Sequence, residues 1–211
     1  YFSNQFIEVK NITSWKKYII DDVSLVNYGK SLIEIDREKK LIIIKDIETS
    51  SRTVFFGGTL REWKIEYDGE FLGSKHSRKM NGLTGCLTFL DIEIKDIELN
   101  LKNSKCEDSV NFIRSKGSIK KAEIQNSSSD ALDADFSDLV IKNIIIKNSK
   151  NDCLDFSFGK YKIKNAVLDN CGDKGISFGE QSIGIVNKIE INNSSIGVAA
   201  KDSSFVTIKN I

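Results

Sequence analysis

The sequence contains no proline, and only one histidine among its 211 residues. Without proline, the turns must be built largely from Asn, Asp, Ser and Gly, whose side chains bond nearby backbone or permit left-handed conformations. The four cysteines contain no C-x-x-C pair, which together with a single histidine argues against a zinc site. We expect them to be buried thiols; the alternative is one or two disulfides that link neighbouring repeats. These cysteines are Cys86, Cys106, Cys153 and Cys171.

A long apolar run and a charge excess are also missing. No segment approaches the roughly 20 apolar residues of a transmembrane helix, so we expect no membrane span. The 31 basic and 30 acidic residues nearly cancel, and no basic block stands out, so we expect no nucleic-acid partner. The chain begins at Tyr1 without a methionine and ends at Ile211 inside a repeated motif. We therefore expect it to be part of a longer protein.

A four-residue motif recurs at nearly constant spacing through the second half. It reads IKNI at 141–144, IKNA at 163–166, VNKI at 186–189 and IKNI at 208–211, with starts 22, 23 and 22 residues apart. A related IKKA at 119–122 precedes the first by 22. Such a period is typical of repeat proteins, and each unit holds two short strands that cannot bury a face alone. We predict an all-β fold, a right-handed parallel β-helix of about 22 residues per coil, with the hand taken from the general rule for parallel connections.

Residues at equivalent depths of the repeats share a chemical character. Two apolar columns are expected in the core: Val110, Leu132, Leu154 and Ile176, then Phe112, Ala134, Phe156 and Phe178. The column on the opposite face of the same strands is polar: Asn111, Asp133, Asp155 and Ser177. An asparagine ladder should occupy the turns: Asn126, Asn148, Asn170 and Asn193, with Ser104 one step earlier. Phe136 and Phe158 are likewise expected in core stacks.

The first half of the chain is less regular. The motif recurs at 9–12, 44–47 and 94–97, with steps of 35, 50 and then 25 residues. We interpret this as one β-helix domain over residues 1–211, with irregular coils carrying insertions in 1–106 and regular coils in 107–211. One insertion, around 57–80, holds Trp63, Tyr67 and His76, and such loops often form the binding face. The alternative places Trp63 and Tyr67 on an ordinary alternating strand.

Charged residues follow the turns of successive repeats. In the 22-residue register Asp108, Asp130 and Asp152 stack with Lys174 next, and Asp133 stacks on Asp155. Equivalent residues of adjacent coils lie about 5 Å apart, and carboxylates at that distance raise one another's pKa or recruit a cation. Paired carboxylates of this kind supply an acid and a base, and calcium is the cation that converging oxygens would bind. The sequence indicates no other cofactor.

These segments resemble the motif series of the polygalacturonase family, within the pectin-lyase-like superfamily of β-helix proteins. The family pattern is Asn-Thr-Asp-Gly-x-Asp, Asp-Asp-Cys, Gly-His-Gly-[Ile/Leu]-Ser-x-Gly and Arg-Ile-Lys on successive coils. Matching segments are SSDALD at 128–133, NDC at 151–153, DKGISFG at 173–179 and AAK at 199–201, within the last third of the chain. Asp130, Asp152 and Lys201 match, while Asn151, Lys174 and Ala199 replace the family's Asp, His and Arg.

The resemblance implies a carbohydrate-active site. An Asn cannot donate a proton as a general acid, which argues against inverting hydrolysis by the family's mechanism. The same residues would also suit a lyase or epimerase, which needs a base and a cation beside a carboxylate, so lyase, epimerase and hydrolase chemistry all stay open. The expected partner is an acidic, uronate-containing polysaccharide outside the cell or at its surface. Expected catalytic residues are Asp130 and Asp152, as acid/base or cation ligands, and Lys174, as base or charge stabiliser. Expected substrate-binding residues are Asp133, Asp155, Asp173 and Lys201.

Two other interpretations remain open from the sequence. The ladder could simply be solvated turn residues, each exposed pair contributing less than about 1 kcal/mol. The chain could also be a non-catalytic β-helix, a rigid structural or assembly module of a larger cell-surface protein. In that case a further domain or subunit would cover the strand edge at its C-terminal end.

Overall fold

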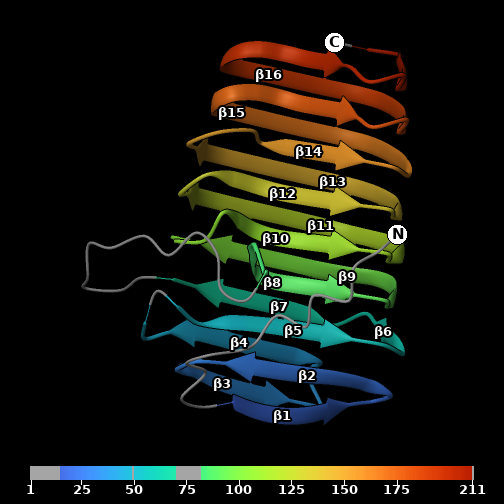
Figure 1. Cartoon of the computed structure of the whole chain (residues 1–211). Helices are drawn as coiled ribbons and strands as arrows, with labels where there is room; N and C mark the ends of the chain where they lie inside the picture. The colour runs from blue at the N-terminus through green and yellow to red at the C-terminus, as the bar shows by residue number, and fades with distance from the viewer. Residues whose placement is uncertain (1–14, 49, 70–81, 211) are drawn as a thin grey trace, which may run out of the picture.

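The computed structural model describes residues 15–48, 50–69 and 82–210, and all regular secondary structure in these ranges is β-strand. The strands stack into a parallel β-solenoid of about 7 turns, with coils about 22 residues apart (Figure 1). The predicted all-β parallel solenoid and its repeat length are thereby confirmed, while its right-handed sense stays a prediction. No helix long and apolar enough to cross a membrane occurs in the described ranges.

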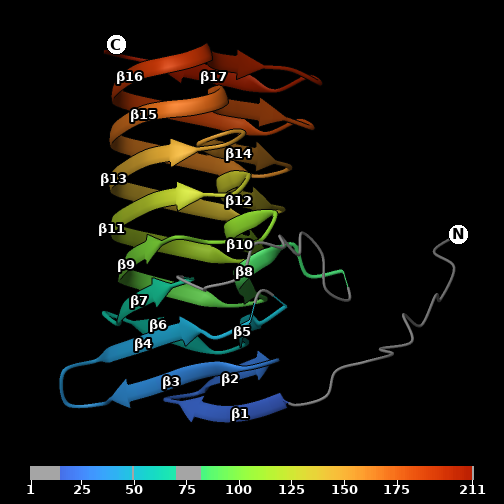
Figure 2. The same ribbon diagram turned by 90° about the vertical axis from the view of Figure 1, so that its left-hand side faces the viewer.

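The strands of the described residues belong to one continuous 17-stranded sheet that winds around the solenoid, and we call the three faces of each regular coil sheets A, B and C (Figure 2). Sheet A contains β8 (Gly85–Leu90), β10 (Asp108–Ile113), β12 (Asp130–Asp135), β14 (Leu154–Ser157) and the last residues of β15 (Lys160–Gly179) and β16 (Ile183–Ala200). Sheets B and C are the first and second parts of the longer strands β9 (Glu93–Lys102), β11 (Lys116–Ser127), β13 (Asp138–Ser149), β15 and β16, with β17 (Phe205–Ile208) ending sheet B.

The bend between sheets B and C follows from the sequence pattern. In β13 Leu139, Ile141, Ile144 and Ile146 are buried, so the alternation of buried and solvent-facing residues skips one position after Ile141. Lys142 and Asn143 consequently both point away from the core. Two consecutive outward residues are incompatible with a straight strand, which turns its side chains to opposite faces in succession. The repeated Ile-Lys-Asn motif is therefore the corner of each coil.

The first strands form antiparallel hairpins rather than coils with insertions. Strand β1 (Trp15–Ile20) pairs antiparallel with β2 (Val23–Tyr28), and β3 (Ser31–Asp36) pairs antiparallel with β4 (Leu41–Asp46). Parallel stacking begins where β4 pairs with β7 (Lys64–Asp68), β5 (Arg52–Phe56) with β8, and β6 (Thr59–Arg61) with β9. The expected irregular coils in this region are thus replaced, at the N-terminal end, by a cap of two hairpins (Figure 1).

Two early copies of the motif, at 44–47 and 94–97, do not occupy the position in the coil that the motif match predicted. The residue opposite Ile119 is Ile97, whereas the motif match placed Ile94 there. Ile44 pairs with Tyr67, and Tyr67 pairs in turn with Leu101 on sheet C. The motif match had instead placed Ile44 at the corner of the coil. Apolar and polar residues alternate similarly in the predicted and the observed alignment, so the motif alone could not distinguish the two. The copy at 9–12 and His76 lie outside the described residues.

Trp63 and Tyr67 belong to the core. Tyr67 lies on β7, Trp63 directly precedes that strand, and the two side chains are 2% and 1% exposed respectively. The Trp63 indole N–H donates to the carboxylate of Asp21, and the Tyr67 hydroxyl donates to Asp46. Of the two interpretations of this segment, the ordinary strand is therefore confirmed.

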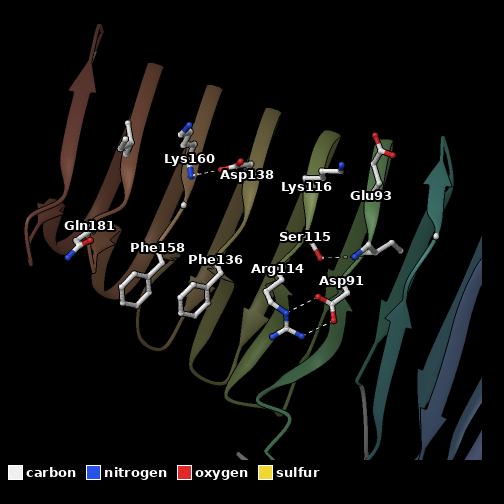
Figure 3. Close-up of a pocket in the computed structure, with 14 residues that line it drawn as sticks. Asp91, Glu93, Arg114, Ser115, Lys116, Phe136, Asp138, Phe158, Lys160 and Gln181 are labelled. Atoms are coloured by element: carbon white, nitrogen blue, oxygen red, sulfur yellow. Dashed lines mark hydrogen bonds and ion pairs between the residues drawn. The ribbon is translucent and has the colours of Figure 1, made fainter. Parts of the chain in front are cut away.

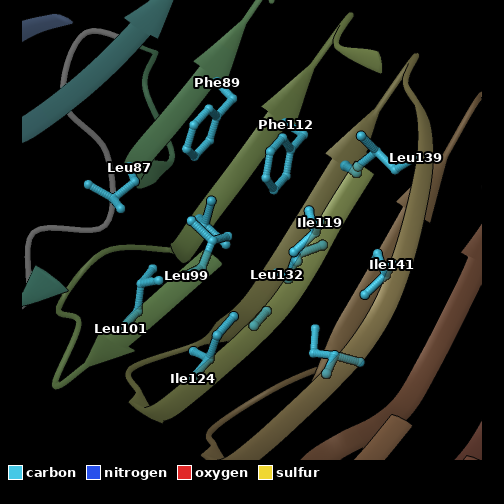
Figure 4. Packing of buried hydrophobic residues seen from close by; sticks show 14 of the residues in the cluster. Leu87, Phe89, Leu99, Leu101, Phe112, Ile119, Ile124, Leu132, Leu139 and Ile141 are labelled. Atoms are coloured by element: carbon cyan, nitrogen blue, oxygen red, sulfur yellow. The ribbon is translucent and has the colours of Figure 1, made fainter. Parts of the chain in front are cut away.

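Apolar columns fill the interior of the solenoid (Figure 4). Pairing in sheet A aligns Val110, Leu132, Leu154 and Ile176, and aligns Phe112, Ala134, Phe156 and Phe178. All eight are completely buried, as predicted. The rings of Phe55, Phe89 and Phe112 stack with centroids 4.7 and 4.6 Å apart. Each such side chain contributes roughly 1.5–3 kcal/mol by leaving water, so the core holds adjacent coils together.

The asparagine ladder is also present. The Asn148 amide donates to the Asn126 side-chain oxygen at 3.0 Å, and the Asn170 amide donates to Asn148 at 2.9 Å. The preceding step is Asn103, which accepts from Asn126, and not the expected Ser104. All of these asparagines have positive φ, between 59° and 60°, which Asn tolerates better than most residues. Asn193 departs from the ladder by donating to Asp169.

The expectation of free thiols is wrong. Cys86 is bonded to Cys106, and Cys153 is bonded to Cys171. Each disulfide closes one turn of the solenoid, because its first cysteine lies at the start of sheet A and its second at or just after the end of sheet C in the same coil. All four cysteines are buried at the inside of this corner. Closure of the coil brings together positions 18 and 20 residues apart, a spacing that no cysteine motif predicts.

Removal of the second disulfide should destabilise the solenoid without altering its fold. The loop that it closes is 18 residues long, for which loss of the cross-link costs about 3 kcal/mol of unfolding free energy. We expect this loss for the double variant Cys153→Ser, Cys171→Ser, measured by urea unfolding against the oxidised parent. The far-ultraviolet spectrum should be unchanged. Equal midpoints for the two proteins would mean that this pair is not cross-linked.

Candidate functional site

The predicted site residues lie on sheet A and in the turn before it. We call this surface the acidic face; its carboxylates are Asp108, Asp130, Asp133, Asp135, Asp152 and Asp155. Asp108 pairs with Asp130 in the ladder, and Asp133 pairs with Asp155. The predicted stacking of these residues is therefore present. What each side chain does chemically depends on its hydrogen bonds and burial.

Asp130, Asp152 and Lys174 form a vertical series on three successive coils. The backbone N–H of Asp152 donates to Asp130 Oδ1 at 2.7 Å, and the backbone N–H of Lys174 donates to Asp152 Oδ1 at 2.9 Å. Each carboxylate thus binds the main chain of the next coil. This hydrogen bonding gives the two aspartates a structural role in holding the turns together, as expected for Asp in turns.

Lys174 lies between two carboxylates. Its Nζ is 3.4 Å from both carboxylate oxygens of Asp152 and also contacts the carboxylate of Asp173. Asp152 is only 2% exposed, whereas the Asp173 side chain is 43% exposed. The hydrogen bond that Lys174 donates to the Asp173 carboxylate is the main reason that the pKa of Lys174 is raised. The amino group is therefore held as a cation beside the acidic face.

Burial raises the pKa of several carboxyls on this face. The pKa of Asp130 is raised to about 6, although hydrogen bonds from the Asp152 backbone and the Asn151 amide act in the opposite direction. The pKa of Asp108 is raised to about 7, again chiefly by burial, with the charge of Asp130 adding to the effect. Desolvation disfavours the charged form, so these groups retain protons at pH values where an exposed Asp is ionised.

One outward row of sheet A concentrates polar groups. Pairing between coils aligns Thr88, Asn111, Asp133, Asp155 and Ser177. Burial raises the pKa of Asp133 well above its usual range and also raises that of Asp155. The Asn111 amide donates to Asp133 Oδ2 at 3.0 Å. Among the described residues, two buried oxygens of this row have no hydrogen-bond partner, Thr88 Oγ1 and Asn111 Oδ1, while a hydrogen bond from Ser177 acts against burial on the pKa of Asp155.

The remaining predicted residue, Lys201, approaches the same row. A methyl group added at Gly179 would lie 3.0 Å from Lys201 Cε, which shows that the lysine stem crosses the end of sheet A. Its positive charge lowers the pKa of Asp155, in opposition to burial. All seven predicted site residues are therefore gathered on adjacent coils, while their catalytic or binding roles stay predictions. Within the described ranges, no group of three or more His, Cys, Asp or Glu residues is arranged to hold a metal ion.

A cavity of about 940 Å³ lies at the corner between sheets A and B, beside the acidic face. We call it the corner groove (Figure 3). One wall comes from the turn: Asp91, Arg114, Phe136, Phe158 and Gln181. The other comes from the start of sheet B: Glu93, Lys116, Asp138, Lys160 and Ile183. None of the residues predicted from the sequence as catalytic or substrate-binding lines it.

Phe136 and Phe158 were wrongly predicted to be core residues. Their side chains are 57% and 42% exposed, whereas Phe156 and Phe178 are buried as predicted. The φ angles of Phe136 and Phe158 are 52° and 48°, and this left-handed conformation interrupts the strand alternation and directs both rings outward. The signal in the sequence was a phenylalanine followed by Ser137 or Gly159, a small residue that continues the turn.

Comparisons with known proteins identify no relative. A scan against protein-family models finds no match, and searches of curated proteins and of solved structures find no significant similarity. The β-solenoid is thus established by the arrangement of the strands alone. Membership of the pectin-lyase-like superfamily and the polygalacturonase resemblance stay predictions.

Raised carboxyl pKa values predict that stability falls as pH rises. Between about pH 4 and pH 7 the folded state holds more protons than the unfolded chain on Asp108 and Asp130, whose folded pKa values are about 7 and 6. The midpoint of thermal unfolding should therefore be higher at pH 5 than at pH 8. Asp108→Asn, which mimics the neutral carboxyl, should reduce this difference. An equal or higher midpoint of the parent at pH 8 would contradict the assignment.

Proposed function

We propose that this chain binds an acidic, uronate-containing polysaccharide on the acidic face and modifies it by lyase or epimerase chemistry. The observation that carries the proposal is the stack of carboxyls with raised pKa next to Lys174 and Lys201. An ionised acidic face would repel a uronate polymer. Protonated carboxyls instead donate hydrogen bonds to its carboxylates and hydroxyls, and the two lysines supply positive charge.

The repeating geometry supports a polymeric ligand. Coils follow one another at about 4.8 Å, so sheet A presents similar groups at regular intervals along one line. Asp133 and Asp155 occupy equivalent positions on adjacent coils, and Asn111 and Ser177 continue the row on either side. Asp133 and Asp155 are only partly buried and offer hydrogen bonds to hydroxyl groups of successive sugars.

The proposed chemistry begins with removal of the proton next to the uronate carboxylate. Asp130, with a pKa of about 6, is the proposed base, since a group that titrates near the working pH transfers protons efficiently. Lys174 and Lys201 neutralise the carboxylate and stabilise the negative charge that develops beside it. In a lyase the adjacent C–O bond then breaks and the leaving oxygen takes up a proton. In an epimerase a proton returns to the same carbon from the other face.

Asp152 has a different part in this scheme. Its burial and its bonds to Lys174 make it a positioning residue that holds the lysine in place, rather than a group in contact with substrate. The motif resemblance supports the choice of substrate class. The two disulfides support a location outside the cytosol, at the cell surface or beyond, because disulfides persist in oxidising compartments.

Turnover and binding should depend on different residues of the acidic face. With polygalacturonate and alginate as substrates, we expect unsaturated products or epimerised residues, detected by absorbance and by NMR. Asp130→Asn should lower turnover by about a hundredfold or more. Lys201→Ala should weaken binding about tenfold, and binding should be tighter at pH 5 than at pH 8. Lys147→Ala, an exposed lysine on sheet C, is the matched control and should change neither.

Two results would contradict the proposed function. If no uronate polymer is bound at either pH, the proposed ligand class is wrong. If binding occurs without turnover under every condition, the acidic face is a binding surface and the catalytic assignment of Asp130 is wrong.

A second candidate is a non-catalytic structural or assembly module. The specific observation in its favour is the apolar surface at the C-terminal end of the solenoid, where Ile196 and Phe205 are 44% and 73% exposed. On sheet A, residues 198–200 of β16 pair with β15 on one side only within the described ranges. Under this proposal a further domain or subunit covers that edge, because uncovered strand edges favour association. Absence of both binding and turnover in the preceding assays would favour this candidate.

A further inference from the structure

The corner groove is a second site, distinct from the acidic face. We propose that it binds an uncharged glycan chain lying along the solenoid axis. Its volume of about 940 Å³ is within the range of ligand-binding cavities. It extends across successive coils from Asp91 to Gln181 and combines an apolar wall with a polar wall (Figure 3). The proposal does not depend on the uronate proposal, because the two surfaces share none of their proposed ligand-binding residues.

The apolar wall is a pair of exposed aromatic rings. Phe136 and Phe158 stand on successive coils, nearly parallel to each other at 2°, with their centroids 4.6 Å apart (Figure 3). Together with Ile183 they present apolar surface to the solvent. Exposed aromatic rings grouped beside polar side chains are typical of ligand-binding sites. A pyranose ring fits such a wall because its C–H groups form an apolar surface while its hydroxyls lie at the rim.

The groove is preorganised by the backbone of the coils. The N–H of Phe136 donates to the Ser157 carbonyl at 3.0 Å, and the N–H of Phe158 donates to the Glu180 carbonyl at 3.1 Å. Behind the rings, Gly159 permits close approach of the next coil: an added methyl group there would lie only 2.0 Å from the Ser137 carbonyl oxygen. Little conformational freedom of the main chain remains to be lost on binding, which favours affinity.

The polar wall alternates in charge along the axis. Pairing in sheet B places Glu93, Lys116, Asp138 and Lys160 at equivalent positions of consecutive coils. On the opposite wall Arg114 forms two hydrogen bonds of 2.7 Å with the Asp91 carboxylate. The groove therefore holds three acidic and three basic residues, and its formal charge is zero.

This alternation selects the ligand class. A hydroxyl group both donates and accepts hydrogen bonds, so it can bind a carboxylate at one coil and an ammonium group at the next. A polymer with one kind of charge would meet a like charge at every second coil, which is unfavourable. An uncharged polyol chain with a repeat close to the coil spacing of about 4.8 Å satisfies both requirements.

An extended peptide fits less well. Peptides that add a strand to a sheet require an edge with unpaired backbone groups. Here the backbone N–H groups of the wall are already bonded between coils, as in the bond from the Arg114 N–H to the Asp135 carbonyl at 3.0 Å. The groove runs along the direction of stacking and offers side chains for recognition, which favours a glycan.

The proposal can be tested by calorimetry with neutral hexasaccharides. Cellohexaose, xylohexaose and mannohexaose serve as probes for the whole chain at neutral pH. We expect at least one to bind, and we expect Phe136→Ala and Phe158→Ala each to weaken that binding by about tenfold. Phe56→Ala removes a phenyl ring that is 47% exposed outside the groove, and it should leave the affinity unchanged. The unfolding midpoint of each variant verifies that it is folded.

Three results would overturn the proposal: no binding of any of these probes at millimolar concentration, equal weakening by Phe56→Ala, or loss of binding in Asp130→Asn, which would mean that the two surfaces act as one. The uronate polymers provide the separating control. Their binding should be unchanged by Phe136→Ala if the acidic face is a separate site. Each of the two proposed sites can therefore fail while the other stands.

Discussion

Hydrogen bonding between successive coils is the constraint on which every other feature of this chain depends. A regular coil contains one short strand and one longer, bent strand and cannot bury an apolar face alone. Stacked in register, the coils satisfy one another's backbone groups and bring residues about 22 positions apart to within about 5 Å. The apolar columns and the asparagine ladder follow from that vertical proximity, and the two disulfides follow from the closure of individual coils. Both candidate sites depend on the same stacking for their rows of side chains.

Proximity has opposite consequences inside and outside the coil. Inside, Phe89 and Phe112 gain contact without cost, because identical apolar groups stack well. Outside, stacking aspartates places like charges together, and burial makes ionisation more costly still. The chain accommodates this in two ways. Asp152 is compensated by the backbone N–H and the amino group of Lys174. Asp108 and Asp130 instead acquire raised pKa values, Asp130 despite hydrogen bonds from the Asp152 N–H and the Asn151 amide. The second response leaves carboxyls that hold protons at pH values where an exposed Asp is ionised.

The sequence pattern predicted those features that repeat with a constant period. Val110 and Leu132 share a column because strand alternation and the 22-residue step are both visible in the sequence. Features that depend on local backbone conformation were not predictable from periodicity. The positive φ of Phe136 reverses the side of the strand on which its ring lies, and the offset of Ile97 preserves the same alternation. Likewise, the sequence does not distinguish an aspartate whose carboxylate faces the stacked carboxylate of the next coil from one whose carboxylate accepts hydrogen bonds from backbone N–H groups.

Distances along sheet B measure the stacking most directly. Nitroxide labels on Lys116→Cys and Phe205→Cys, 89 residues apart in the chain, are separated by four ladder steps, about 19 Å, before the length of the labels is added. Moving the first label to Glu93→Cys adds one step. Pulsed electron paramagnetic resonance should give two narrow distributions whose means differ by about 5 Å. Broad distributions, or a longer distance for the Lys116 pair, would contradict the in-register solenoid.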